Sequence, residues 1–406
     1  MINITKKFDW TTLILLLILM FLGVVAIYSA STVKIGDTIQ TNNYYQRQLL
    51  WIFISLIVLI LQLNISYQVI EIILVPAYIL VLFFLILVLF LPTIKGAHRW
   101  IPLAFFKFQP SELAKIVTIL LVAKYISKRH LSETQILLRG FIITIPVFLL
   151  VLVEPDLGTS LTLIVSLFAM FYASELRFFF VIILISPILS LIFSFSIPLF
   201  IIYLILLIFI LYKNRLSHII IAFTSVINLF IFFLTPLLWN TLKSYQQNRI
   251  LTFFNPAKDP FGSGYQIIQA KIAVGSGGFW GKGFLDGTQK NLNFLPEHHT
   301  DFIFSVIGEE FGFFGCIIIV GLYFLILYRI AKKTMLLKKD EERIAAVGIL
   351  AYLTFQIFIN IGMNLGIVPT TGIPLPFISY GGTNLLINVM AVGFILKFFN
   401  ERSVFH

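Results

Sequence analysis

Long apolar runs recur along the whole chain, and they constrain its fold more than any other feature. A helix that crosses a lipid bilayer needs about 20 mainly apolar residues. Hydrophobic residues make up 59% of this 406-residue chain and charged residues only 12%, whereas a soluble domain has about 25% charged residues. This composition excludes an ordinary soluble fold, a disordered chain and a coiled coil, and the single cysteine, Cys316, excludes a disulfide-stapled secreted scaffold. The sequence therefore predicts an all-α polytopic integral membrane protein.

About twelve runs are candidate spans. They lie near residues 10–29, 49–63, 70–91, 111–126, 136–153, 158–174, 178–196, 197–212, 217–238, 302–329, 345–368 and 377–398. Because several of them are short enough to be re-entrant or merged, we predict 10–12 transmembrane helices in a single domain over residues 1–406. The first run follows Lys6 and Lys7, and it is long enough to be an uncleaved anchor instead of a signal peptide.

The basic residues predict the orientation of the chain. There are 29 Lys and Arg against 18 Asp and Glu, a formal net charge of +11, and they gather in short clusters at the ends of apolar runs. Such clusters are topology signals, and no soluble face is large enough to bind a nucleic acid. The cytoplasmic clusters would be Lys6/Lys7, Lys124/Lys128/Arg129, Lys213/Arg215 and the loop 329–343. This orientation puts both termini in the cytoplasm and puts segments 31–48, 95–110, 240–301 and 369–376 on the outer face.

Segment 95–115 carries the first group of unusual polar residues. Pro110 suits the first position of a helix, which places Glu112 in the first turn and Lys115 three residues later. One interpretation is a well-formed helix start with an ion pair and with Trp100 as an interfacial anchor. The other is that Glu112 and Lys115 line a polar cavity near the outer surface, because ionisable residues within spans are costly and usually functional.

Two further outer segments leave alternatives open. The turn Glu154-Pro155-Asp156 is either a tight connection between spans or a pair of functional carboxylates. The loop 240–301 is long for a connection between membrane helices, which favours a function. Its glycine-rich part, Gly275 to Gly278, has the composition of a phosphate cradle, but it matches neither a P-loop nor a dinucleotide fingerprint.

The end of this loop reads Glu297-His298-His299-Thr300-Asp301. The two histidines are adjacent, so they would not share a helix face as an i,i+4 metal-binding pair does, and a zinc site is disfavoured. Asp301 stands where the polar loop meets the apolar run 302–329. It is either a reactive carboxylate at this boundary or, with Thr300, a cap of the following helix.

Taken together, these segments resemble the SEDS family (the shape, elongation, division and sporulation proteins RodA, FtsW and SpoVE). The matching residues are Arg99-Trp100, Phe108 to Glu112 with Lys115, Glu154 to Thr159, Arg249-Ile250, Asn255-Pro256, Gly264-Tyr265 with Gln269, Gly275 to Gly278, Phe294 to Phe302, Asn360 to Met363, Pro374 to Pro376 and Ser379 to Gly382. Individually these motifs are modest, but together they cover nearly the whole chain in the family's order.

Within the family the chain is more similar to RodA than to FtsW. Gly281 to Gln289 resembles the loop of elongation-type members, and Thr370-Thr371 stands where division-type members tend to carry a lysine. The family usually has ten spans, so the surplus is expected between residues 197 and 238. The sequence does not decide whether this segment crosses the membrane twice.

The resemblance implies a peptidoglycan glycosyltransferase for cell-wall elongation and cell shape. Such an enzyme polymerises lipid II into β-1,4-linked glycan strands at the outer face of the bacterial cytoplasmic membrane and releases undecaprenyl diphosphate. Its expected partners are a class B penicillin-binding protein and other elongation-complex membrane proteins. No cofactor is predicted with certainty, and Mg²⁺ or Mn²⁺ is a candidate for charge compensation at the diphosphate.

The resemblance also assigns roles to residues. Inversion at the anomeric carbon needs one base, and by resemblance that base is Asp301. The expected substrate-binding residues are Arg99, Trp100, Glu112, Lys115, Arg249, Tyr265, Gln269, Lys271, Lys282, Glu297 and His299.

Other functions remain as alternatives. A flippase or transporter for lipid-linked oligosaccharides fits the many spans and broken helices, but it predicts charges spread through the bilayer midplane. A non-catalytic scaffold predicts that Asp301, Glu112 and Lys115 can be replaced with little effect. A different glycosyltransferase with a prenyl-diphosphate donor would differ only in its substrates.

Overall fold

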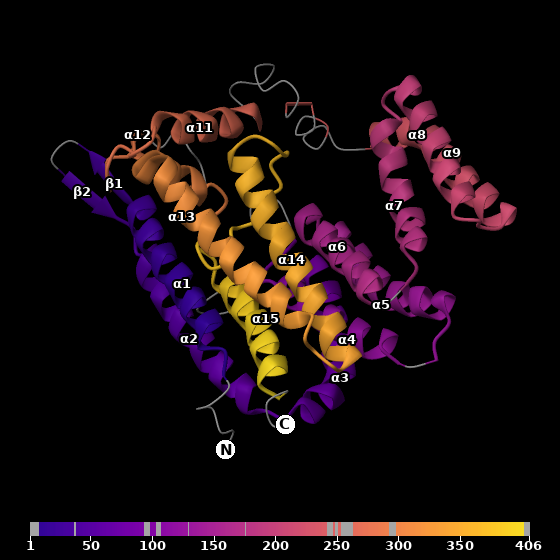
Figure 1. The fold of residues 1–406 in the computed structure, drawn as a ribbon. Coiled ribbons are helices and arrows are strands. Elements are labelled where there is room, and N and C mark those ends of the chain that lie inside the picture. The colour runs from indigo at the N-terminus through magenta and orange to yellow at the C-terminus, as the bar shows by residue number, and fades with distance from the viewer. Residues whose placement is uncertain are drawn as a thin grey trace.

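The helices of the computed structural model follow the apolar runs of the sequence (Figure 1). The structure describes residues 8–35, 38–92, 98–102, 107–128, 130–174, 176–241, 247, 251–252, 263–291 and 298–401. The long helices are α1 (Trp10–Ser31), α2 (Tyr44–Asn64), α3 (Tyr67–Leu89), α4 (Pro110–Ile126), α5 (Glu133–Val153), α6 (Leu157–Ala173), α7 (Phe178–Phe193), α8 (Ile197–Lys213), α9 (His218–Thr241), α13 (Ile303–Thr334), α14 (Asp340–Asn364) and α15 (Gly382–Glu401). The other described elements are α11 (Ser263–Ser276), α12 (Thr288–Asn291), β1 (Thr32–Ile35), β2 (Thr38–Thr41), β3 (Ile101–Pro102) and β4 (Lys107–Phe108).

Each predicted run corresponds to a helix, which confirms the all-α polytopic fold. Among the described residues, eight helices are long and apolar enough to cross a membrane, and α6, α7 and α8 are shorter apolar helices. The predicted ends were less accurate. Helix α13 continues to Thr334 and α14 begins at Asp340, because charged residues extend these helices beyond their apolar parts.

Local sequence signals explain several helix starts. Pro110 opens α4, as predicted, and Ser132 caps α5 in a capping box with Gln135. Asp9 is the N-cap of α1, and it also pairs with Arg329 at 2.6 Å and with Lys333 at 2.7 Å. These contacts tie the start of α1 to the end of α13.

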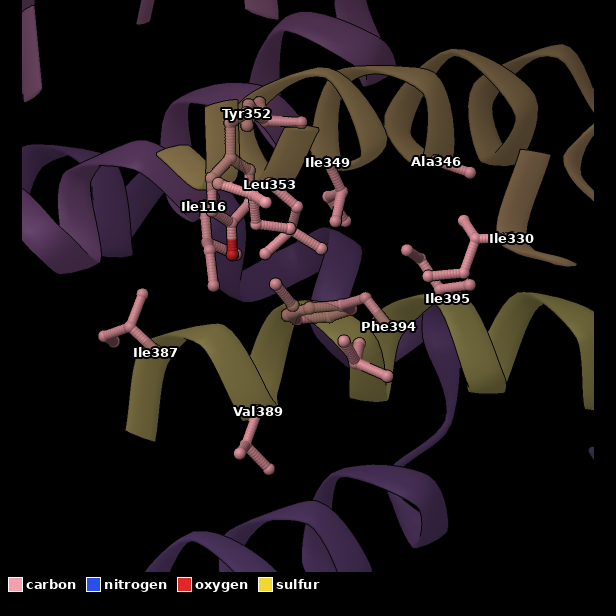
Figure 2. Packing of buried hydrophobic residues seen from close by; sticks show 14 of the residues in the cluster. Ile116, Ile330, Ala346, Ile349, Tyr352, Leu353, Ile387, Val389, Phe394 and Ile395 are labelled. Atoms are coloured by element: carbon pink, nitrogen blue, oxygen red, sulfur yellow. The ribbon is translucent and has the colours of Figure 1, made fainter. Parts of the chain in front are cut away.

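The core lies where α4, α14 and α15 meet (Figure 2). Ile116 of α4, Ile349 and Leu353 of α14 and Ile395 of α15 point into it and are at most 1% exposed. Hydrophobic transfer does not drive helices together inside a bilayer, so close packing must hold them. Small residues permit it: a Cβ at Gly23 of α1 would clash with the backbone of the loop before α15.

Helices α7, α8 and α9 form a separate unit beside the bundle, and the contacts of this unit with the bundle are mainly those between α6 and α7 (Figure 1). A buried polar cluster holds the unit together. The Tyr203 hydroxyl lies 2.6 Å from the Ser186 carbonyl and 2.9 Å from Asn228 Oδ1, and Ser190 Oγ donates to the Asn228 carbonyl at 2.8 Å. Segment 197–238 therefore contains two helices, the surplus that the sequence indicated.

One end of the bundle carries the short strands and helices that lie in the polar segments between the long helices. The antiparallel pair β1–β2 follows α1, and α11 and α12 lie above the start of α13 (Figure 1). The opposite end holds the first described residues, the last ones and the basic loop between α13 and α14. The candidate site lies at the first of these ends.

Candidate active site

The backbone of Asp301 is fixed to α14 by two asparagines. Asn360 and Asn364 stand one turn apart and both donate to the Asp301 carbonyl, at 2.9 and 3.0 Å. Asn364 Oδ1 also accepts from the Ser305 amide at 3.1 Å and from its hydroxyl at 2.6 Å. Asn360 in addition donates to the Ile373 carbonyl at 2.8 Å. One pair of side chains thus joins the turn before α13 to α14 and to the loop before α15.

The preceding residues are held from other directions. Ser379 Oγ donates to the Thr300 carbonyl at 2.6 Å, and the Tyr380 amide donates to the His299 carbonyl at 3.0 Å. The His299 ring stacks on Tyr44, with 4.3 Å between the ring centroids. The structure therefore brings His299, a predicted site residue, to the same fixed turn as Asp301.

The two histidines point in different directions. His298 Nε2 lies 2.8 Å from the Ala30 carbonyl, and the two imidazole rings lie 5.6 Å apart with an interplanar angle of 82°. Among the described residues, no group of three His, Cys, Asp or Glu side chains is arranged to hold a metal ion.

The Asp301 carboxylate lies beside the loop between α14 and α15. Gly372 has a φ of 75°, and a Cβ there would lie 3.5 Å from Asp301 Oδ2. The side chain of Asp301 is partly exposed, and the N-cap residue of α13 is Phe302 instead of Thr300 or Asp301. Asp301 therefore stands in the turn ahead of the helix, next to the assigned cap residue.

Glu112 and Lys115 form the predicted ion pair and lie in a buried polar chain. Lys115 Nζ lies 2.8 Å from Glu112 Oε2, and their side chains are 0% and 5% exposed. Asn384 of α15 donates to Glu112 at 3.0 Å and accepts from Asn388 at 2.9 Å. The Tyr352 hydroxyl of α14 donates to Asn388 at 3.0 Å. The pair therefore links α4, α14 and α15, and contact of either residue with a substrate stays a prediction.

The turn before α6 contains two different carboxyl groups. Asp156 is the N-cap of α6 and accepts from the Thr159 amide at 3.2 Å and from Gln109 at 3.0 Å. Glu154 is fully buried, and neither of its carboxyl oxygens has a hydrogen-bond partner among the described residues. Arg99 donates to the carbonyls of Glu154 and Pro155. The predicted substrate-binding guanidinium thus has a structural role in holding this turn.

Burial raises the pKa of Glu154 to about 9 from its usual value of 4.5, with a further contribution from Asp156 and a smaller opposing one from Arg99. The folded pKa lies above the unfolded one, so the stability that depends on the neutral form is full below pH 4.5 and decreases as the pH rises toward 9. We expect the free energy of unfolding of the wild type in detergent to fall between pH 6 and pH 9, with a limiting slope of roughly 1.4 kcal/mol per pH unit. The unfolding temperature should fall with it.

In Glu154→Gln the amide cannot ionise, so we expect the pH dependence to be flatter. Asp340→Asn is a suitable control, because Asp340 is 45% exposed at the opposite end of the bundle. Equal slopes for the wild type and Glu154→Gln would show that Glu154 is already ionised in the folded protein.

The glycine-rich loop repairs a break in α13. Gly312 has φ 63° and ψ −160°, a conformation that is essentially restricted to glycine, and it interrupts the helical hydrogen bonds. The freed amides of Phe313 and Phe314 donate to the carbonyls of Gly278 and Phe279, at 2.9 and 3.3 Å. The freed carbonyls of α13 are satisfied in turn, because Glu309 accepts from the Lys282 amide at 2.9 Å and Glu310 from the Gly283 amide at 3.1 Å. Four bonds thus replace the two intrahelical bonds that the break removes.

These contacts explain the glycines at positions 277 and 281 without a phosphate-binding role. A Cβ at Gly277 or at Gly281 would clash with the backbone of α13. The loop can reach the broken helix only because side chains are absent at these positions.

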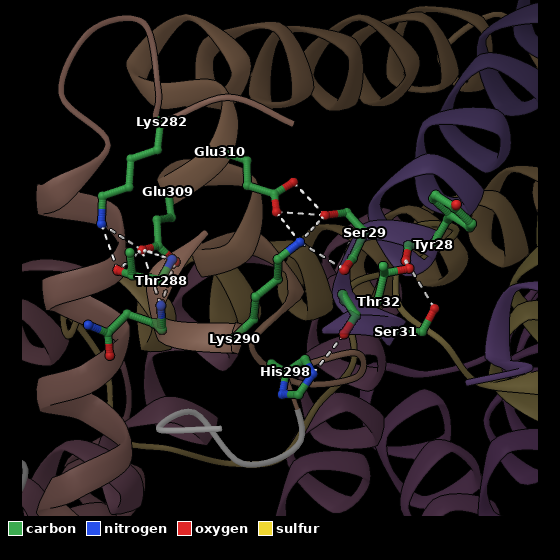
Figure 3. A network of polar contacts seen from close by, with 12 residues as sticks. Tyr28, Ser29, Ser31, Thr32, Lys282, Thr288, Lys290, His298, Glu309 and Glu310 are labelled. Atoms are coloured by element: carbon green, nitrogen blue, oxygen red, sulfur yellow. Dashed lines mark hydrogen bonds and ion pairs between the residues drawn. The ribbon is translucent and has the colours of Figure 1, made fainter. Parts of the chain in front are cut away.

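Two ion pairs lie beside this junction, one partly exposed and one fully buried (Figure 3). Glu309 pairs with Lys282 at 2.7 Å and accepts from the Thr288 amide and hydroxyl, both at 2.8 Å. Glu310 pairs with Lys290 and accepts from Ser29 Oγ at 2.6 Å. Lys290 also donates to the Ser29 carbonyl at 3.0 Å. Each buried charge is therefore compensated, and the network joins α12 to α13 and α1.

The other predicted site residues are spread over this end of the bundle. Tyr265, Gln269 and Lys271 lie on α11, and the Lys271 side chain lies against Gly366. Trp100 is half-buried directly before β3. Arg249 and Glu297 lie outside the described residues.

Sequence reasoning missed several residues of this site. Lys290, Glu309 and Glu310 were not predicted, although two adjacent glutamates inside an apolar run are an available signal. The contacts of Asn364 and Ser379 with this turn had no comparable signal in the sequence, because single polar residues near helix ends are common.

Comparison with known proteins identifies the family. The family model described as "Cell cycle protein", for FtsW, RodA and SpoVE, matches residues 9–199 and 195–403. The chain belongs to this family. The two matched stretches meet at 195–199, at the start of α8, where the surplus helices begin.

Relatives of both the division and the elongation type are similar to this family member. It is 35% identical to the probable peptidoglycan glycosyltransferase FtsW of Trichlorobacter lovleyi over 96% of its length and 93% of the relative's. It is 34% identical to the peptidoglycan glycosyltransferase MrdB of Escherichia coli over 99% of its length and 98% of the relative's. These identities do not separate the two types, so the RodA-type assignment still rests on residues 281–289 and 370–371.

Solved structures of the family share the fold. A chain from the work "Structural coordination of polymerization and crosslinking by a peptidoglycan synthase complex" has a TM-score of 0.72 and 28% identity, with 97% of this chain and 98% of that chain covered. The rod shape determining protein RodA of Thermus thermophilus has a TM-score of 0.65 and 24% identity, with 98% of both chains covered. The SEDS resemblance is therefore confirmed.

Proposed function

We propose that the chain is a peptidoglycan glycosyltransferase that polymerises lipid II into β-1,4-linked strands and releases undecaprenyl diphosphate. One observation carries the proposal: a partly exposed carboxylate, Asp301, stands on a turn whose backbone is fixed by Asn360 and Asn364 at one end of a membrane bundle. The curated relatives are named as enzymes of this kind. Lipid-linked substrates can keep their tails in the bilayer while their sugars reach this end.

The reaction is a single inverting displacement. The acceptor 4-hydroxyl oxygen attacks the anomeric carbon of the donor, the new glycosidic bond forms and the bond to the diphosphate breaks. Asp301 takes the proton of the attacking hydroxyl as the general base. The asparagines fix the backbone that carries the carboxylate, which lowers the entropy that must be lost in the transition state.

The diphosphate that leaves needs positive charge nearby. Among the predicted cations, Lys271 on α11 is a candidate for this charge. Its side chain lies against Gly366, in the loop after α14. Lys282 is paired with Glu309, and Arg99 binds backbone carbonyls, so their proposed contact with substrate would require an exchange of partners.

The proposal includes an orientation and a partner. The basic loop between α13 and α14 would lie in the cytoplasm with both termini, which places Asp301 on the outer face. The peptidoglycan synthase complex among the similar structures supports a class B penicillin-binding protein as the partner.

The activity is tested with lipid II in liposomes, with and without a class B partner whose transpeptidase is disabled. We expect glycan strands and released undecaprenyl diphosphate. Competition with other prenyl-diphosphate donors separates a lipid II polymerase from a related transferase. Transport of lipid II across the bilayer without polymer formation would instead support a flippase.

The orientation is tested with a cysteine at Asn214, which follows α8. In a Cys316→Ser background we expect no labelling of Asn214→Cys by an impermeant thiol reagent in intact cells, and full labelling after permeabilisation. A matched cysteine at Thr371, between α14 and α15, should be labelled from outside. Labelling of Asn214→Cys in intact cells would contradict the topology.

A further inference from the structure

A cavity lies at the end of the bundle opposite to Asp301, where α4 ends and α5 begins. It has a volume of about 410 Å³ and is lined by Val75, Leu121, Tyr125, Lys128, Arg139, Ile142 and Ile143. Helices α3, α4 and α5 all contribute to it. This volume is within the range of about 300–1,000 Å³ that is typical of small-molecule sites.

The walls of the cavity are apolar and open toward the lipid. Leu121 and Ile143 are buried, whereas Val75 is 37% exposed and Ile142 is 68% exposed. A helix surface with exposed isoleucine and valine near the membrane faces acyl chains instead of water. The apolar wall of the cavity at Val75 and Ile142 therefore suits a hydrocarbon chain.

Two cations stand at the polar rim of the cavity. Arg139 Nη1 donates to the Tyr125 carbonyl at 3.1 Å, which fixes the guanidinium at the end of α4 and leaves its other donors available. Lys128 Nζ lies 5.1 Å from the centroid of the Tyr125 ring. Within the described part of the chain, neither Lys128 nor Arg139 forms an ion pair with a carboxylate. The neighbouring Lys124 is used differently, because it donates to the Glu71 carbonyl at 2.7 Å.

We propose that this cavity binds an anionic phospholipid, with its phosphate between Lys128 and Arg139 and an acyl chain along Val75 and Ile142. Basic pockets between transmembrane helices at the cytoplasmic side are suited to anionic head groups. The ligand is distinct from the polymerisation substrate, because Tyr125 at the rim of the cavity stands 13 residues beyond Glu112 on α4, about 20 Å of helix. The inference does not depend on the proposed glycosyltransferase activity.

The test is lipid retention by the full-length protein, measured by native mass spectrometry, together with the unfolding temperature. Phosphatidylglycerol, phosphatidylethanolamine and inorganic phosphate are added separately. We expect phosphatidylglycerol alone to be retained and to raise the unfolding temperature. Lys128→Gln should weaken phosphatidylglycerol binding about fivefold, the effect of one basic residue near an anionic surface, and Arg139→Gln should add a similar factor.

Two further variants keep the test decisive. Ile142→Trp fills the cavity without changing the charge, and we expect it to displace the lipid as well. Lys213→Gln removes a basic residue from the end of α8, away from the cavity, and should leave binding unchanged. Equal retention of phosphatidylglycerol by the wild type, Lys128→Gln and Ile142→Trp would overturn the proposal. Equal stabilisation by inorganic phosphate, or equal retention of phosphatidylethanolamine, would overturn the assignment to an anionic lipid.

Discussion

Asp301→Asn is expected to lower lipid II polymerisation by about 10²–10⁴-fold, the usual effect of removing a general base. The amide has nearly the same shape as the carboxylate but cannot accept the proton of the attacking hydroxyl. The anchoring bonds from Asn360 and Asn364 go to the backbone of Asp301, so the substitution leaves them in place. Glycan strands are measured by gel electrophoresis of labelled product, with the class B partner present.

A matched control removes a carboxylate elsewhere. Glu133 pairs with Arg177 at 2.6 Å at the start of α5, on the opposite end of the bundle, and Glu133→Gln should retain wild-type activity. Unfolding temperatures of both variants should match that of the wild type. Glycan strands of normal length and yield from Asp301→Asn would show that another group is the base.

Lys290→Met is expected to destabilise the protein by about 3–5 kcal/mol, because it leaves the buried carboxylate of Glu310 without its cation. Both side chains of the pair are at most 1% exposed, so water cannot replace the lost charge. Thermal unfolding in detergent measures the loss. Limited proteolysis should also cut more rapidly between α11 and α13, since Lys290 anchors this segment to Ser29.

The double variant Lys290→Met/Glu310→Gln distinguishes charge from packing. It removes both charges, so we expect it to recover most of the lost stability. Lys282→Met is a milder comparison: the Lys282 side chain is 28% exposed, and Glu309 keeps the amide and the hydroxyl of Thr288 as donors. A larger loss for Lys282→Met than for Lys290→Met would contradict this ranking.

The sequence predicted the helices well because their signal is local. Twenty apolar residues in a row leave few alternatives to a spanning helix, and Pro110 marks a helix start by its own chemistry. The ion pair of Glu112 and Lys115 was predictable for the same reason, since three residues on a helix bring the two side chains together.

The environment of Asp301 was not predictable in this way. Asn364 and Ser379 reach the turn from 63 and 79 residues further along the chain, and no local pattern announces such pairings. The glycine loop is a similar case. Its composition suggested an anion site, but the glycines are required because Gly312 breaks α13 and the loop must approach its backbone.

The repaired break in α13 has a consequence for the order in which the chain assembles. Its contacts are comparatively near in sequence, since Lys282 and Glu309 are 27 residues apart, so they form once α13 has been synthesised. The contacts that fix Asp301 come later, from α14 and from the loop before α15. We therefore expect a nascent chain to have the loop before α13 attached to α13 while Asp301 is still unanchored, and we expect activity only when the last two helices have entered the membrane.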